Sequence, residues 1–223
     1  MVAKLWWMIH KDLVSEWRAR RAWPAMLLFG MVVALMFSAQ IDPIPERKAQ
    51  ITGSLLWLAI FFAGMLAIDR SFAVEREEGC GQGLLLYPIS SAAIYLAKLG
   101  VNVVALGALQ AVLIPLFIVL CDAPLAIHPW AMLLVAILGN LGIASVGTLL
   151  SALTSGTRQS GSLLALLALP LAIPVVLAAS KATQCLGEDQ IDADWWRWVQ
   201  LLGAFAGVFM TAGVLLFDFV MED

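Results

Sequence analysis

Charged residues are scarce in this chain, and their scarcity limits what the chain can be. Asp, Glu, Lys and Arg make up 13% of the 223 residues, whereas hydrophobic residues make up 62%. An average soluble domain carries roughly 25% charged residues. The composition therefore excludes a mainly soluble protein and indicates a chain that crosses a membrane several times. The few basic residues form no stripe, so we expect no nucleic-acid partner.

Cysteine is also rare. The three cysteines, Cys80, Cys121 and Cys185, are too far apart to form a C-x-x-C or a C-x-x-C-H motif. This spacing excludes the usual zinc, dithiol redox and covalent haem motifs. No predicted span carries paired carboxylates or a His/Glu metal constellation. We therefore predict that the chain is not an enzyme and holds no metal or cofactor of its own.

A nucleotide-binding motif is missing too. The sequence contains no G-x-x-x-x-G-K-[ST] and no Gly-Lys pair, so it has no P-loop. Gly79, Gly81 and Gly83 do not match the dinucleotide fingerprint, and we interpret them as turn glycines. Any work driven by ATP must therefore reach this chain through contact with another chain.

Long apolar segments are the main feature that the sequence does contain. A helix that spans a bilayer needs roughly 20 mainly apolar residues. On this basis we predict a single all-α transmembrane domain, residues 1–223, in a polytopic membrane protein with six transmembrane helices. The spans are expected at residues 24–40, 51–68, 94–120, 129–153, 161–179 and 199–220.

The segment before the first span is amphipathic. In residues 2–21, Trp6 and Trp17 recur with other apolar residues at helical spacing, while Lys11 and Arg18 fall elsewhere. This pattern predicts an interfacial helix that lies in the headgroup layer.

The distribution of Lys and Arg predicts the orientation. With the N-terminus inside, nine of these residues fall on the inner side and four on the outer side. Because cytoplasmic loops carry the excess of Lys and Arg, this asymmetry predicts that both termini are cytoplasmic.

The longest charged interruption between spans is predicted to be a cytoplasmic coupling loop at residues 69–93. Its leucine segment lies between a glycine turn and a proline and is too short to cross a bilayer. It is long enough for a short helix with one apolar side, which we expect to bind a soluble partner. An ordinary charged loop is the alternative. The predicted contact residues are Glu75, Arg76, Glu77, Glu78, Gly79, Leu84, Leu85, Leu86 and Pro88.

Three polar side chains inside the spans are costly to expose to lipid. Asn102, Gln110 and Asn140 are expected to face the bundle interior or a cavity. They either form hydrogen bonds between helices or take part in transport, and the sequence leaves both readings open. In the last span, Gly203 and Gly207 form a G-x-x-x-G, which favours close helix packing and self-association.

The predicted coupling loop also carries a family resemblance. The run 75–79, followed by 84–88 and Lys98, resembles the loop of ABC-2-type export permeases that docks on the ATPase. More narrowly, nearly the whole chain resembles the haem exporter B subunit of the bacterial cytochrome c maturation system. The other matching segments are Lys11-Asp12-Leu13, Phe62-Ala63-Gly64, Arg70-Ser71-Phe72-Ala73, Gly147-Thr148-Leu149, Thr157-Arg158, and the pair Pro170 and Pro174.

The resemblance implies a permease subunit of the bacterial inner membrane. Its implied partners are an ABC ATPase subunit dimer and haem-handling membrane subunits, with haem as the transported substrate. The implied role is haem delivery on the outer side for attachment to apocytochrome c. The alternative is a membrane scaffold that couples the ATPase to a haem-chaperone complex without passing substrate. Both share the same docking loop, so the sequence does not separate them.

Candidate haem contacts lie on the predicted outer side. His128 stands next to Pro129 and Trp130, where it is placed to reach an axial position of a haem, and a capping or interfacial role is the alternative. Trp195 and Trp196 precede the last span, where they form either an aromatic belt or a haem-stacking pair. We expect partner chains, rather than His128, to supply any axial ligand.

Overall fold

Six α-helices form the part of the chain that the structure describes. The computed structural model describes residues 22–38, 45–77, 91–122, 125, 127–154 and 160–222. These residues contain no strand, in agreement with the predicted all-α class. The helices are α2 (Ala22–Ser38), α3 (Pro45–Glu77), α5 (Ser91–Cys121), α6 (Pro129–Thr154), α7 (Ser160–Gly187) and α8 (Ala193–Glu222).

Five of these helices are long and apolar enough to cross a membrane. Their apolar stretches are Ile51–Asp69, Ser91–Cys121, Pro129–Thr154, Leu166–Gly187 and Ala193–Phe217. The sixth, α2, has 17 residues, slightly fewer than the roughly 20 that a perpendicular span needs. The predicted interfacial helix at residues 2–21 lies outside the described residues.

Several helices extend beyond the predicted spans. Helix α3 continues to Glu77, so the first part of the segment predicted as a loop from residue 69 is helical. Helix α7 continues to Gly187 instead of ending at residue 179. Hydropathy marks only the apolar middle of such a helix, whereas Arg, Glu, Lys and Gln favour its continuation into water.

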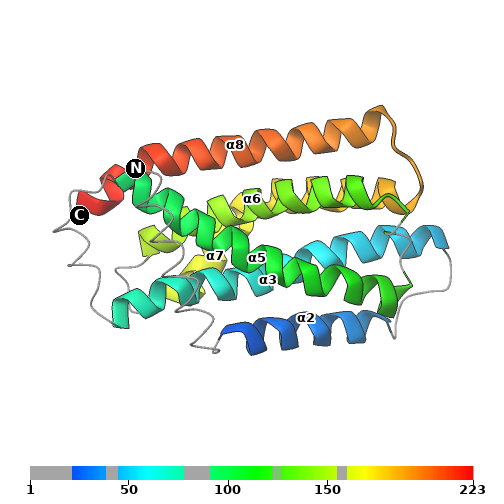
Figure 1. The fold of residues 1–223 in the computed structure, drawn as a ribbon, viewed down its shortest axis with the longest axis horizontal. Helices are drawn as coiled ribbons and strands as arrows, with labels where there is room; N and C mark the ends of the chain where they lie inside the picture. The colour runs from blue at the N-terminus through cyan, green and yellow to red at the C-terminus, as the bar shows by residue number, and fades with distance from the viewer. Residues whose placement is uncertain are drawn as a thin grey trace.

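The helices alternate in direction along one long axis (Figure 1). Helices α2, α5 and α7 run one way, and α3, α6 and α8 run the other way. One end of the bundle therefore holds the end of α3, the start of α5 and the end of α8. The opposite end holds the α5–α6 and α7–α8 turns. We call these the α3-end and the turn-end. A short connection between two consecutive spans stays on one side of the membrane. Consecutive spans must therefore run in opposite directions, as these helices do.

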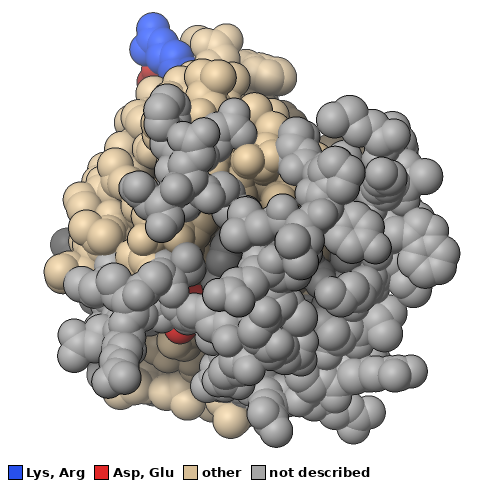
Figure 2. Space-filling model, turned by 90° about the vertical axis from the view of Figure 1, so that its left-hand side faces the viewer, with Lys and Arg blue, Asp and Glu red and all other residues tan. Residues whose placement is uncertain are grey.

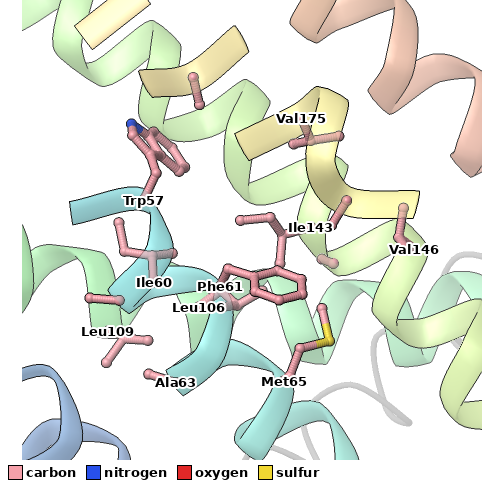
Figure 3. Packing of buried hydrophobic residues seen from close by; sticks show 14 of the residues in the cluster. Trp57, Ile60, Phe61, Ala63, Met65, Leu106, Leu109, Ile143, Val146 and Val175 are labelled. Carbon is pink, nitrogen blue, oxygen red and sulfur yellow. The ribbon is translucent and has the colours of Figure 1, made fainter. Parts of the chain in front are cut away.

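The centre of the bundle is made by α3, α6 and α7, which pack against one another. Trp57 and Phe61 of α3 are almost completely buried, and the Phe61 ring lies beside Ile143 of α6 (Figure 3). Gly139 of α6 permits this approach, since a Cβ atom there would lie 2.3 Å from the Trp57 ring. Without a strong hydrophobic force between helices in lipid, such close packing is the main source of cohesion.

Candidate functional site

The predicted coupling segment lies at the α3-end. Glu75, Arg76 and Glu77 form the last turn of α3. The remaining predicted contact residues, in 78–90, lie outside the described residues, so their contact with a partner stays a prediction. The fold brings the end of α3 and the start of α5 to the same end of the bundle, as a loop between them requires (Figure 1). Figure 2 shows this end, where a small acidic surface is visible.

The three polar residues predicted inside the spans all lie in the interface between α5 and α6. Asn102 Nδ2 donates to Thr148 Oγ1 at 2.8 Å, and Asn140 Nδ2 donates to the Val103 carbonyl at 3.0 Å. All three side chains are buried. Gln110 Nε2 completes the set with a longer bond of 3.4 Å to the Ala136 carbonyl.

The geometry of this α5–α6 interface favours the structural reading over a transport path. Each of the three amides donates one hydrogen bond to the opposite helix, and these bonds hold the antiparallel pair in register. Such bonds contribute about 0.6 kcal/mol on average, and at most about 1.7, to helix association in a membrane. Asn140 is paired only through its amide nitrogen, because its Oδ1 is buried and has no hydrogen-bond partner.

Sequence reasoning missed a further polar contact at the same interface. Tyr95 is completely buried, and its hydroxyl donates to the Ser145 carbonyl of α6 at 3.4 Å. Its ring lies against the α8 backbone at Gly213, where a Cβ atom would come within 2.1 Å of the ring. One of only two tyrosines, in an otherwise aliphatic span, is the signal that would have identified it.

A second missed contact joins α3 to α7. Trp57 Nε1 donates to Thr183 Oγ1 at 2.8 Å, and that hydroxyl donates in turn to the Ala179 carbonyl at 2.7 Å. The indole N–H is a donor only, so a buried tryptophan needs such an acceptor. The sequence offers no means of pairing two residues that are 126 positions apart.

His128 pairs with a carboxylate at the turn-end. Its Nε2 lies 2.5 Å from Oδ1 of Asp189, in the turn between α7 and α8. Asp189 adopts a φ of 58°, which lets the turn bring its side chain toward the start of α6. An axial haem ligand must offer a ring nitrogen to the iron. Since Asp189 occupies Nε2, iron binding through that atom would first have to break this pair.

The two predicted tryptophans of α8 have different surroundings. Trp195 is 2% exposed and packs edge-on against Trp196 at 4.9 Å between ring centroids. Trp196 is 51% exposed, and Trp130 at the start of α6 is 81% exposed at the same end. The burial of Trp195 excludes a stack of both rings on one haem in this conformation. The two exposed tryptophans, Trp196 and Trp130, are placed as an aromatic belt would require.

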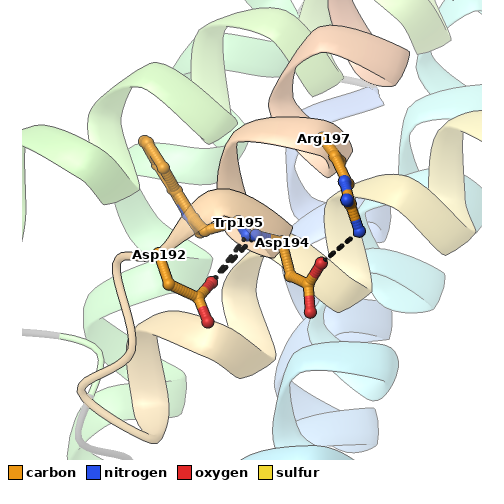
Figure 4. A network of polar contacts seen from close by, with 4 residues as sticks. All are labelled: Asp192, Asp194, Trp195 and Arg197. Atoms are coloured by element: carbon orange, nitrogen blue, oxygen red, sulfur yellow. Dashed lines mark hydrogen bonds and ion pairs between the residues drawn. The ribbon is translucent and has the colours of Figure 1, made fainter.

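The start of α8 is fixed by a helix cap (Figure 4). Asp192 Oδ1 accepts hydrogen bonds from the backbone N–H groups of Asp194 at 3.0 Å and Trp195 at 3.1 Å. This cap explains why α8 begins at Ala193 and not at the predicted residue 199. Arg197 also pairs with Asp194 at 2.7 Å, but both side chains are largely exposed and the pair contributes little to stability.

The predicted self-association residues lie on the outside of the bundle. A Cβ atom at Gly203 or Gly207 would have no neighbour within 4 Å. Thr211, one turn further, donates to the Gly207 carbonyl of its own helix. Gly203 and Gly207, which we call the α8 glycine stripe, therefore make no close packing contact with the described helices. Their use in contact with a second copy stays a prediction. Among the residues described, no group of three or more His, Cys, Asp and Glu side chains could hold a metal ion.

Comparison with known proteins gives a consistent set of matches. A family model described as CcmB protein matches residues 3–221. Heme exporter protein B of Rhodobacter capsulatus is 31% identical over 174 residues, which cover 78% of this chain and 79% of the relative. The protein of the same name from Pseudomonas aeruginosa is 29% identical over 180 residues, or 81% and 80% of the two chains. The one from Escherichia coli K12 is 31% identical over 166 residues, or 70% of each chain.

Proposed function

This chain belongs to the CcmB family, and we propose that it is the transmembrane subunit of an ABC-type exporter that takes part in haem delivery for c-type cytochrome biogenesis. The observation that carries the proposal is the family match over residues 3–221, which includes every described helix apart from the last residue of α8. The names of the relatives supply the substrate, haem. The bundle supplies a multi-pass membrane body for such a subunit.

A separate ATPase supplies the energy in this proposal. The chain has no P-loop, so ATP must be bound by a partner protein. An ABC ATPase dimer is the simplest such partner. The site of contact is the coupling segment at the α3-end. There Leu84, Leu85 and Leu86 fill a groove on the ATPase, and the acidic run that ends α3 sets the register at its rim.

The α3-end faces the cytoplasm in this arrangement, together with both termini. The excess of Lys and Arg in the segments at this end supports that orientation. The turn-end, with His128 and the exposed Trp196, then faces the periplasm, where haem-handling membrane subunits receive the substrate. Those partners supply the axial ligands of haem in this proposal, and the pairing of His128 Nε2 with Asp189 supports this assignment.

A non-transporting scaffold is the second candidate function, and one observation favours it. The amide nitrogens of the three intramembrane residues all donate across the α5–α6 interface, so these donors do not line a polar path through the bundle, although Asn140 Oδ1 has no partner. Such a scaffold would pass the movement of the ATPase to a haem-chaperone complex. It would use the same coupling segment as the exporter.

Haem flux into sealed vesicles separates the two functions. The vesicles contain the reconstituted complex with the ATPase outside, and haem uptake is followed with ATP and with a non-hydrolysable analogue as the control. The exporter predicts uptake only with ATP. ATP hydrolysis that supports release of haem from its chaperone, without uptake, would replace the exporter with the scaffold.

A substitution in the coupling segment tests the contact with the ATPase in either case. Leu85→Glu places a charge in an apolar groove, so we expect loss of ATPase co-purification and of cytochrome c maturation. Glu75→Gln is the matched control, because a rim charge is screened by salt and its loss should change little. Wild-type co-purification and maturation with Leu85→Glu would rule out this segment as the coupling element.

A further inference from the structure

One face of α5 carries small residues and points away from the bundle. Val104, Gly107 and Ala111 follow one another at steps of three and four, so they lie on one side of the helix. Val104 is 48% exposed, Ala111 is also exposed, and Gly107 is partly buried. A Cβ atom at Gly107 would have one neighbour within 4 Å among the described residues, Nδ2 of Asn140, at 3.4 Å. We call Val104, Gly107 and Ala111 the α5 small-residue face.

This face lies in the hydrocarbon region of the membrane. Gly107 is close to the midpoint of α5, whose 31 residues run from Ser91 to Cys121. Ala111 lies about one helical turn further on. At 1.5 Å per residue, positions within about ten residues of the midpoint of a spanning helix lie inside a hydrocarbon core about 30 Å thick. The solvent at this level therefore consists of acyl chains, which form no hydrogen bonds with protein groups.

A proline leaves one acceptor on this face without its partner in the helix. In a regular helix the Ala111 carbonyl would accept the N–H of residue 115, but that residue is Pro115, which has no N–H. Both Ala111 and Pro115 are exposed. In membrane helices the carbonyls that proline leaves unpaired are satisfied by neighbouring helices, by hydroxyl side chains or by water. Because Ala111 faces out of the bundle, the described helices do not supply this donor.

A second unpaired acceptor lies beneath the same face. Asn140 of α6 is 5% exposed, and its Nδ2 donates to the Val103 carbonyl at 3.0 Å. Its Oδ1 has no partner, which is costly for an amide in the membrane interior. Only Gly107, which has no side chain, covers this amide on the open side. The terminal torsion of Asn is broad, so a small rotation turns Oδ1 toward the gap at Gly107.

The two acceptors select the kind of molecule that covers this face. An acyl chain fills the space but offers no donor. A second copy that packs through the same face about a two-fold axis presents the same residues, and none of Val104, Gly107, Ala111 and Pro115 has a side-chain donor. A helix of another protein with a hydroxyl or amide side chain in mid-span supplies the donor, and small residues let its backbone come close.

We propose that the α5 small-residue face binds a transmembrane helix of a partner subunit. A Ser, Thr, Asn or Gln side chain in the middle of that helix donates to the Ala111 carbonyl and contacts the Asn140 amide through the gap at Gly107. The identification of this partner with a haem-handling membrane subunit rests on the proposed function. The docking face itself follows from the unpaired acceptors and the small residues.

Photo-crosslinking identifies the occupant in the assembled complex. The chain is co-expressed with the ATPase and the haem-handling membrane subunits, and a diazirine amino acid replaces Ala111 in one variant. The reference variant carries it at Leu166 of α7, which is 71% exposed. We expect the adduct at position 111 to be an apolar peptide of a haem-handling subunit that contains Ser, Thr, Asn or Gln, and the adduct at position 166 to be lipid.

The other outcomes at position 111 would overturn the proposal. They are a lipid adduct alone, a peptide from a second copy of this chain, and a peptide without such a side chain. Failure of the proposed function gives a different result, because the haem-handling subunits would then not co-purify with the wild-type chain. If only the docking face is wrong, these subunits co-purify and no peptide is captured at position 111.

Pro115→Ala tests the role of the unpaired carbonyl. Alanine supplies an N–H at position 115, so the Ala111 carbonyl regains its partner in the helix and no longer needs a donor from outside. We expect the yield of the peptide adduct at position 111 to fall about three-fold, as the loss of one hydrogen bond between membrane helices implies. Pro170→Ala is the matched control, because it removes an exposed proline from α7 and should leave the yield unchanged. An unchanged yield with Pro115→Ala would refute the bond to Ala111.

Gly107→Leu tests the close approach of the partner helix. The leucine closes the gap over Asn140 and keeps the helices apart, so we expect co-purification of the haem-handling subunits to fall about ten-fold. Val112→Leu is the control, since Val112 is 48% exposed and its side chain points about 100° away from that of Ala111. Thermal unfolding in detergent shows whether each variant is folded. If Gly107→Leu is not folded, Ala111→Leu makes the same test at an exposed position. Wild-type co-purification with a folded variant would contradict docking on this face.

Discussion

The apolar stretches of helices α6 and α8 have nearly the same length and mean hydropathy, but the two helices lie in different environments. In α6, 72% of the apolar stretch is buried, whereas in α8 the figure is 22%. Both helices carry three glycines. In α6, Gly139 and Gly142 receive Trp57 and Val175. In α8, only Gly213 receives a side chain, that of Tyr95, whereas Gly203 and Gly207 have no neighbour within 4 Å. The comparison shows that an apolar helix with small residues does not reveal by itself whether it is central or peripheral.

Replacement of glycine by leucine should give the largest contrast between these helices. In Gly139→Leu the new side chain collides with the Trp57 ring, and we expect a loss of about 3 kcal/mol or more in the free energy of unfolding. Gly203→Leu should change it by less than about 0.5 kcal/mol, since the position is open. Thermal unfolding of the purified proteins in detergent measures both. Equal losses would mean that α8 is packed against another part of the chain.

Loss of a cross-helix amide should have a smaller effect. Asn102→Ala removes the donor to Thr148 across the α5–α6 interface, and we expect a loss of about 0.6–1.7 kcal/mol. Thr211→Ala on α8 is the matched control, because its hydroxyl bonds only within its own helix. A double-mutant cycle with Thr148→Ala isolates the coupling between the two side chains. A coupling of zero would show that the bond does not hold the helices together.

His128→Ala should have a smaller effect still. It breaks the pair with Asp189 at the start of α6, but the Asp189 side chain is 68% exposed and its charge stays hydrated. We expect a loss below about 1 kcal/mol and nearly normal formation of c-type cytochromes. Haem staining of cytochromes in cells, with the amount of this protein measured in parallel, checks both. Complete loss of cytochromes with normal protein levels would assign His128 a role in haem handling.

The smallest effect on folding is expected for Gly207→Leu on the outer face of α8. No neighbour lies within 4 Å of its Cβ position, so the bundle itself should be unaffected. If the stripe joins two copies, however, the leucine keeps the helices apart and should reduce cross-linking between copies. Unchanged cross-linking would show that this face meets lipid or another partner. Val119→Leu, at a position of α5 that is 77% exposed, serves as a control for general effects of a larger surface side chain.

The candidate site could be predicted only in part. Asn102, Gln110 and Asn140 stand out in the sequence because an unpaired amide is costly in lipid, and the structure indeed buries them together. Their partners could not be predicted, since two of the three are backbone carbonyls, which every residue carries. Trp195 was grouped with Trp196 in the sequence, yet one is buried and the other exposed, because neighbours on a helix point in directions 100° apart.

The sequence alone determined the helical class, the positions of the long apolar helices and their alternation. The physical reason is that a backbone in lipid must satisfy its own hydrogen bonds, so each apolar segment of sufficient length becomes a helix. Only the tertiary structure decided that α6 is central and α8 peripheral, and that Trp57 lies on Gly139. Lipid chains are as apolar as leucine, so a side chain that faces lipid and one that faces another helix leave the same mark on the sequence.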